Sequence, residues 1–149
     1  MTEYEITRLM EQRIREIEPE GVSISQITKK SRPLLKTVLK MFPPLGLHLF
    51  LIPRTFTLDG VHHPEGTPLR ADTMEDILQA IKARREEQAL TSYQLDSCLN
   101  TAYGYCHGLE KEWATMSLEM FMRICNVVGF GVTVEKEPDF GPYPKDLFS

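Results

Sequence analysis

The stretch LTSYQLDSCLNTAYGYCHGLEKE (Leu90–Glu112), followed by MSLEMFMRICNVVGFGVTV (Met116–Val134), decides the fold. The first part has the pattern of two short helices joined by a tight turn. Asn100 occupies the turn, where a left-handed residue is needed and asparagine is tolerated. The second part places apolar residues at helical spacing, stops at Gly129 and then alternates. We therefore expect a helix, a turn, two further helices and a short strand.

The N-terminal third repeats part of this pattern. Thr2–Glu18 has apolar residues at three- and four-residue steps, which predicts an amphipathic helix. A short helix is expected over Ile24–Lys30. The next helix begins near Pro33 and stops at Pro43–Pro44, because proline does not continue a helix. LGLHLFLIP (Leu45–Pro53) then predicts a strand that ends at its proline.

Two helix-to-strand segments align at an offset of 83 residues. Leu35 falls on Leu118 and Gly46 falls on Gly129, with apolar strand positions matched after each glycine. This shared order and spacing predict two related lobes in tandem. The alternative is that any two amphipathic helix–strand units look alike.

The predicted lobes are residues 1–54 and 73–136. Between them, residues 55–72 read as a linker because glycines and prolines interrupt any longer element. In the second lobe, Ile77, Leu78, Ile81 and Ala89 are expected to form the inner face of the first helix. The tail, residues 137–149, contains three prolines and is expected to be irregular.

Composition excludes several classes of protein. The 149 residues are 42% apolar, which is enough for a globular core. No run approaches the roughly 18–20 apolar residues that span a bilayer, and the charged N-terminus does not resemble a signal peptide. Three cysteines without CxxC spacing favour buried thiols in a reducing compartment, and they are Cys98, Cys106 and Cys125. We therefore expect a cytoplasmic protein with no membrane partner.

Charge is distributed unevenly along the chain. The net charge is −4, and it divides into +2 for residues 1–71, −4 for residues 72–136 and −2 for the tail. A basic cluster without an intervening acid lies in the first lobe, formed by Lys29, Lys30, Arg32, Lys36 and Lys40. The second lobe, which has the clearer pattern of two helices joined by a turn, is the acidic one.

Catalytic and metal-binding patterns are not found. Asp59, His62, His63 and Glu65 lie in the predicted linker and fit no standard ligand spacing, so a solvated loop is favoured over a metal site. The sequence contains no glycine-rich phosphate loop, nucleophile elbow or HExxH motif. We expect no enzyme activity, no metal and no cofactor.

Residues 75–134 resemble the Cro/CI-type helix-turn-helix domains of the XRE family. The resemblance is carried by Ile81, Arg84, Arg85, Leu90, Thr91, Leu95, Leu99, Leu109, Glu110, Ser117, Leu118, Glu119, Arg123, Ile124 and Gly129. Residues 5–53 resemble the family more faintly, as a shortened copy that lacks room for a complete first helix. The resemblance implies a mainly α fold of tandem lambda-repressor-like helix-turn-helix lobes, each ending in a short β-strand.

In this family, the second helix touches phosphate and the third reads base edges in the major groove. By position, the second lobe would contact DNA through Ser92 and Tyr93 and through a recognition helix carrying Ala102, Tyr103, Tyr105 and His107. The first lobe would contact DNA through Ser25, Gln26, Thr28 and Lys29, with further phosphate contacts from Lys30, Arg32 and Lys36.

The second lobe departs from the family pattern. Asp96 stands where a small alanine is usual, and Gly104 lies inside the expected recognition helix, Ala102–Gly108, at a cost of about 1 kcal/mol. That helix has no lysine or arginine before Lys111, although phosphate contacts come from such residues. These departures leave the DNA-reading role of the second lobe open.

Two functions remain open. The first is a sequence-specific transcriptional regulator that binds double-stranded DNA. Its strands Leu47–Ile52 and Phe130–Glu135 would pair within one chain, as a pseudo-dimer, or across two chains of a homodimer. The second is an interaction protein of the antitoxin or anti-activator type, which keeps the helix-turn-helix fold but acts on a protein partner.

Overall fold

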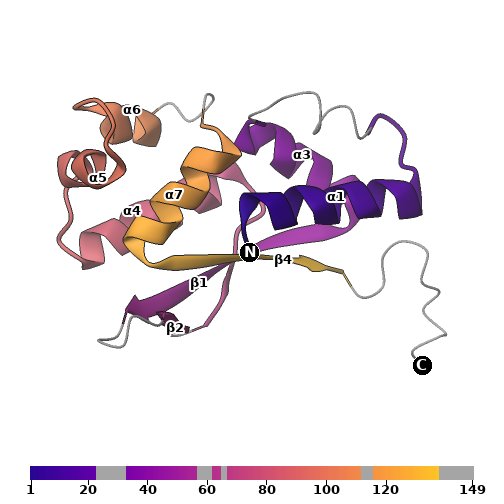
Figure 1. Cartoon of the computed structure of the whole chain (residues 1–149), viewed down its shortest axis with the longest axis horizontal. Helices are drawn as coiled ribbons and strands as arrows, with labels where there is room; N and C mark the ends of the chain where they lie inside the picture. The colour runs from indigo at the N-terminus through magenta and orange to yellow at the C-terminus, as the bar shows by residue number, and fades with distance from the viewer. Residues whose placement is uncertain (23–32, 57–61, 65–66, 112–115, 138–149) are drawn as a thin grey trace.

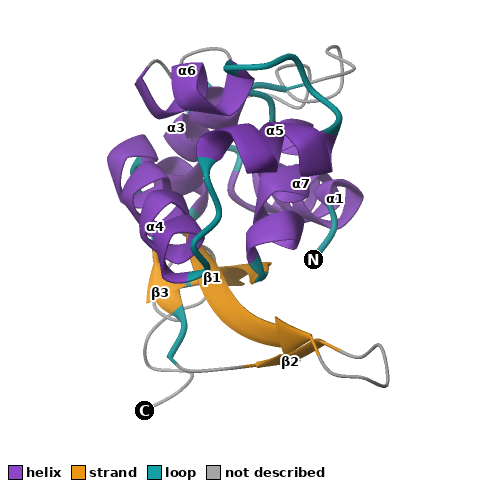
Figure 2. Ribbon diagram, turned by 90° about the vertical axis from the view of Figure 1, so that its left-hand side faces the viewer, coloured by secondary structure: helices purple, strands orange, loops and turns teal. Residues whose placement is uncertain are grey.

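The computed structural model describes residues 1–22, 33–56, 62–64, 67–111 and 116–137. These residues form a mainly helical protein in which the helices cover one face of a small antiparallel sheet (Figures 1 and 2). The helices are α1 (Glu3–Ile17), α3 (Leu35–Leu45), α4 (Met74–Glu87), α5 (Ser92–Leu99), α6 (Tyr105–Lys111) and α7 (Leu118–Val128). The strands are β1 (Leu47–Phe56), β2 (His62–Pro64), β3 (Leu69–Arg70) and β4 (Phe130–Lys136).

Strand β1 is the centre of the sheet. It pairs with β4 along seven residue pairs, from Leu47↔Lys136 to Pro53↔Phe130, and with β2 and β3 over shorter stretches. Its alternate side chains point into the core, as do those of β4, and these buried residues are Leu47, Leu49, Leu51, Phe130, Val132 and Val134. The two predicted strands therefore pair within a single chain.

The pairing of β1 with β4 is two-fold symmetric. Phe50 lies opposite Thr133, and these two residues differ by the repeat offset of 83, so the register is centred on equivalent positions. The hydrogen bonds at the first residues of the preceding helices exchange under the same offset. Leu35 N–H donates to Met116 O and Leu118 N–H donates to Pro33 O, each at 2.9 Å.

The helices that precede these strands match in length and ending. Helices α3 and α7 each have 11 residues and begin 83 residues apart. Each ends at a glycine in the left-handed conformation, Gly46 (φ 65°) and Gly129 (φ 84°), because glycine reverses the chain there without a Cβ clash. We call α1, α3 and β1 the first half, and α4 to α7 with β4 the second half.

The first helices of the two halves also correspond, at an offset of 71. Thr2 and Thr73 are their N-caps, and each side chain accepts the N–H three residues on. Arg13 Nε donates to Leu45 O, the last residue of α3 (3.0 Å), while Arg84 Nε donates to Val128 O, the last of α7 (3.1 Å). The first half therefore has a complete first helix, contrary to the prediction. Its shortening, twelve residues by the two offsets (83 − 71), lies between α1 and α3.

Three prolines are accommodated where the sequence predicted a stop. Helix α3 continues through Pro43 and Pro44 to Leu45, since the fixed φ of proline is compatible with a helix and Gly46 provides the reversal. Strand β1 likewise continues past Pro53. Arg54 N–H faces β4 and donates to Gly129 O (2.8 Å), so the nitrogen of Pro53 faces the opposite edge, and no bond to β4 is lost.

The remaining differences are local. The predicted linker contains β2 and β3, which both pair with β1. Ala89 is exposed with φ 53°, because α4 ends at Glu87 and the chain reverses there. The helix expected over Ile24–Lys30 lies outside the described residues.

A single hydrophobic core joins the two halves. Its buried side chains come from all the described helices and from β1 and β4. Helix α1 packs on α3, and α4 packs on α7, so each half places its first helix against its last. None of the helices in the described ranges is long and apolar enough to cross a membrane.

Candidate nucleic-acid interface

Helices α5 and α6 are two short helices of the second half joined by a turn, and they lie at the end of the molecule away from α1 (Figure 1). Helix α5 begins with a capping box in which Thr91 accepts Gln94 N–H and Gln94 accepts Thr91 N–H. It ends at Asn100, which has the left-handed conformation predicted from the sequence (φ 56°). The two helices are thus joined by a turn with defined ends.

Asp96 organises this turn. Its carboxylate is 2% exposed and accepts N–H bonds from Gly104 (2.8 Å) and Cys106 (2.7 Å), together with the Thr101 hydroxyl (3.3 Å). Burial by itself raises the pKa of Asp96, but the hydrogen bonds from Cys106, Gly104 and Thr101 together outweigh it and hold the pKa below its ordinary value. The carboxylate is therefore charged and serves as the cap of α6.

Because of this cap, the helix at the predicted recognition position starts later than the sequence predicted. Helix α6 begins at Tyr105, and Ala102 and Tyr103 lie in the turn before it. Gly104 is also outside the helix, with φ 87°, a conformation that glycine adopts without strain. The expected helix cost at Gly104 does not apply. The departure at Asp96 has a structural role that the family pattern did not indicate.

The predicted contacts in the second half divide into exposed and buried residues. Ser92 is buried, because Thr91 is the cap and Ser92 is the first residue inside α5. Tyr105 packs against the core, and its burial raises the pKa of its hydroxyl. The exposed members are Tyr93, Ala102, Tyr103 and His107.

Tyr93 and Tyr103 stack on each other outside the core. Their ring centroids are 4.3 Å apart and the planes differ by 10°, while His107 stacks more loosely on Tyr93 at 6.3 Å. Tyr103 is 82% exposed and Tyr93 is 40% exposed. The exposed face of α5 and α6 is consequently aromatic.

The arginine side chains near this face donate hydrogen bonds to main-chain carbonyls. No lysine or arginine occurs between Gln88 and Leu109. From outside that stretch, Arg85 donates to Leu90 O, just before α5, and Arg123 donates to Leu99 O, at the end of α5. From Gln88 to Leu109, the α5–α6 element therefore offers little chemistry for phosphate.

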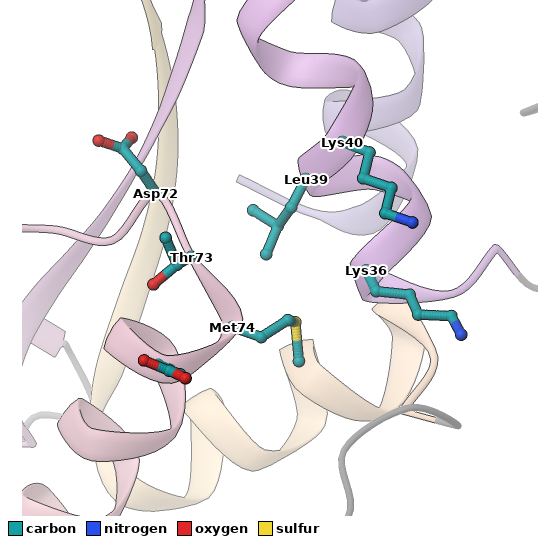
Figure 3. Close-up of a pocket in the computed structure, with 7 residues that line it drawn as sticks. Lys36, Leu39, Lys40, Asp72, Thr73 and Met74 are labelled. Atoms are coloured by element: carbon teal, nitrogen blue, oxygen red, sulfur yellow. The ribbon is translucent and has the colours of Figure 1, made fainter.

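Lys36 of the first half lies one helical turn before Lys40 on α3. Both residues line a cleft of about 640 Å³ between α3 and the start of α4. Figure 3 shows Leu39 and Met74 pointing toward one another across this cleft, with the two lysine amino groups directed away from it. Asp72 and Glu75 line its other wall. Lys36 is thus partly buried, and its amino group is directed out of the cleft, where it is accessible to a partner.

Other predicted site residues of the first half lie outside the described residues, and they are Ser25, Gln26, Thr28, Lys29, Lys30 and Arg32. The cysteine prediction is correct for Cys106 and Cys125, which are buried, and wrong for Cys98, which is exposed on α5. Within the described ranges, no group of three or more His, Cys, Asp or Glu side chains is arranged to hold a metal ion.

The roles of two arginines were not identified from the sequence, and these are the buried Arg13 and the partly buried Arg84. Arg13 and Arg84 each cap the last helix of their half, and each forms an ion pair with a glutamate three residues on. The signal was present as the same Arg–x–x–Glu spacing in the two first helices. It was hidden because the offset there is 71 and not 83. Comparison of the chain with protein-family models, with curated proteins and with solved structures gives no match.

Proposed function

We propose that the chain is a cytoplasmic, sequence-specific DNA-binding transcriptional regulator, built as tandem helix-turn-helix lobes that form a pseudo-dimer within one chain. The observation that supports this most is the two-fold pairing of β1 with β4, which relates two halves of the same helix order. Helix-turn-helix dimers place two such halves on one duplex, and their symmetry matches that of the operator. One chain then takes the place of two.

The two halves contribute unequally to DNA binding in this proposal. The first half carries the basic cluster, of which Lys36 projects from α3. The second half has a capped α5–α6 element whose nearby arginines bind main-chain carbonyls. Most phosphate contacts are therefore assigned to Lys29, Lys30, Arg32 and Lys36. The second half mainly sets the position of the molecule on the DNA and makes few phosphate contacts.

The test is the salt dependence of DNA binding. Fragments recovered by the full chain from genomic DNA at physiological salt serve as the probe, and affinity is measured at several salt concentrations. A variant with Lys29, Lys30, Arg32 and Lys36 all changed to alanine is expected to bind more weakly, with a log–log salt slope smaller by about 3–4. Lys82→Ala, at an exposed position of α4, is the matched control and should lower the slope by less than about 1. An unchanged slope in the fourfold variant would contradict the assignment.

The second candidate function is an interaction protein of the antitoxin or anti-activator type. It is favoured by one observation, the aromatic α5–α6 face with no lysine or arginine between Gln88 and Leu109. Recovery of no DNA fragment by the full chain, together with a purified protein partner that binds it, would favour this candidate over the first.

A further inference from the structure

The most exposed large apolar side chain described is that of Tyr103. One face of its ring is covered by Tyr93 at 4.3 Å, and with 82% of the residue exposed the other face is open to solvent. The ring adds nothing to the core, which it does not contact. An exposed aromatic pair of this kind marks a contact surface, because tyrosine is enriched among residues that dominate binding energy.

The turn that carries Tyr103 is held in place from both sides. Asn100 closes α5 in the left-handed conformation, and the Asp96 carboxylate holds Gly104 and Cys106. Tyr103 lies between these fixed points and is stacked on a residue of the first turn of α5. A ring ordered before binding loses little conformational entropy when a partner covers it.

The electrostatics of this face select the chemistry of the partner. The one acidic group between Gln88 and Leu109, Asp96, is buried and fully engaged with the turn, and no basic residue occurs there. Residues 72–136 carry a net charge of −4. The open face of an aromatic ring is itself electron-rich and attracts a cation. Between Gln88 and Leu109 a polyanion meets no basic side chain, whereas a guanidinium meets the open ring face of Tyr103 within residues 72–136, whose net charge is negative.

The same chemistry already occurs within the described part of the chain. The guanidinium of Arg8 lies over the ring of Tyr4 with its carbon 5.8 Å from the ring centroid. In that pair the ring face is covered by a residue of its own helix, α1. At Tyr103 no described arginine takes this position.

We propose that the α5–α6 face, defined by Tyr93, Tyr103 and His107, binds an arginine-bearing segment of a partner protein whose guanidinium stacks on the open face of Tyr103. This site is separate from the basic cluster assigned to DNA. A regulator with it would carry a nucleic-acid contact in the first half and a protein contact in the second. The proposal does not depend on DNA binding and survives if that function is wrong.

The test uses the full chain and four defined probes. These are a decapeptide of alternating arginine and glycine, the same peptide with lysine, the same with glutamate, and a twelve-residue oligothymidylate. Binding is followed by backbone amide shifts in a two-dimensional NMR spectrum at low salt. The arginine peptide is expected to give saturable shifts at Tyr93, Tyr103 and His107, the lysine peptide weaker ones, and the glutamate peptide and the oligonucleotide none.

Three variants distinguish an effect of the Tyr103 ring on binding from an effect on folding. Tyr103→Ala is expected to weaken the arginine peptide by about tenfold or more, as for a dominant contact residue. Tyr103→Phe keeps the ring face and should stay within about twofold of the wild type. Tyr4→Ala is the matched control, because it removes another exposed tyrosine from a different surface and should leave binding unchanged.

Three results would overturn the proposal. The first is equal binding of the arginine peptide to the wild type and to Tyr103→Ala. The second is tighter binding of oligothymidylate than of the arginine peptide at this face, which would make it a base-stacking surface. The third is concentration-dependent self-association in analytical ultracentrifugation that disappears in Tyr103→Ala, which would make the partner a second copy of the chain.

Discussion

Replacement of Asp96 tests the account of the α5–α6 turn most directly. In the structure this carboxylate is 2% exposed and accepts N–H bonds from Gly104 and Cys106. Asp96→Ala removes this acceptor from the N–H groups of Gly104 and Cys106. The bond to Cys106 is buried. Asp96→Asn keeps one carbonyl acceptor but loses the charge.

The magnitude follows from the bonds that are lost. Hydrogen bonds to a charged group contribute about 1.5–3 kcal/mol each, and loss of a helix cap costs about 0.5–2 kcal/mol. Because the turn relaxes and water reaches part of it, we expect Asp96→Ala to lower the free energy of unfolding by about 2–4 kcal/mol. Asp96→Asn is expected to cost about 1–2 kcal/mol, since one acceptor remains.

The pH dependence of this effect has a definite sign. The pKa of Asp96 is lowered in the folded protein, so the carboxylate stabilises the fold fully above its ordinary value of about 3.9. That contribution is lost as the pH falls below this value toward the lowered pKa. The stability difference between the wild type and Asp96→Asn is therefore expected to be constant near neutral pH and to shrink below about pH 4.

The assay is urea denaturation followed by tyrosine near-ultraviolet circular dichroism, which also reports the stacking of Tyr103 on Tyr93. Ser97→Ala, at an exposed position one residue away, is the control and should stay within about 0.5 kcal/mol. An Asp96→Ala variant that is as stable as Ser97→Ala and keeps the wild-type tyrosine signal would refute this role of Asp96.

Three further predictions concern other parts of the fold. Gly129→Ala is expected to cost about 1–2 kcal/mol in chemical denaturation, because φ is +84° and the added Cβ would lie 3.2 Å from a main-chain oxygen. Gly108→Ala, in open space within α6, should instead stabilise by up to about 1 kcal/mol, and a similar loss in both variants would contradict this account. Arg13→Ala is expected to lower the melting temperature through a loss of about 2–4 kcal/mol, whereas Arg15→Ala on the exposed side of α1 should have little effect. A thiol reagent should modify Cys98 alone in the folded chain and all three cysteines in denaturant, and rapid modification of a second native thiol would show that another cysteine is accessible.

Features that depend on a few neighbouring residues were predictable from the sequence. The left-handed turn at Asn100, the glycine ending of α7 and the alternation of β4 all follow from interactions within about one helical turn or one strand. The repeat offset of 83 also transferred directly into the register of β1 with β4, because matched apolar faces must share one core.

Features that depend on distant partners were not predictable. From the sequence, Pro53 predicts the end of a strand. In the fold its nitrogen faces away from β4, so the strand continues without losing a bond to β4. Asp96 reads as a defect in a helix pair until the main-chain groups of Gly104 and Cys106 converge on it. Arg13 reads as a surface charge in an amphipathic helix, since only the folded chain brings the end of α3 to it.

The pairing of β1 with β4 inside one chain changes how the molecule responds to dilution and to mutation. A strand pair formed between two identical subunits dissociates as the protein is diluted. Strands in one chain meet instead at an effective concentration of about a millimolar, whatever the protein concentration. In a symmetric dimer every substitution also appears twice. Here a change near Phe50 has no copy near Thr133, so the two halves are free to acquire different ligands while the frame that joins them is kept.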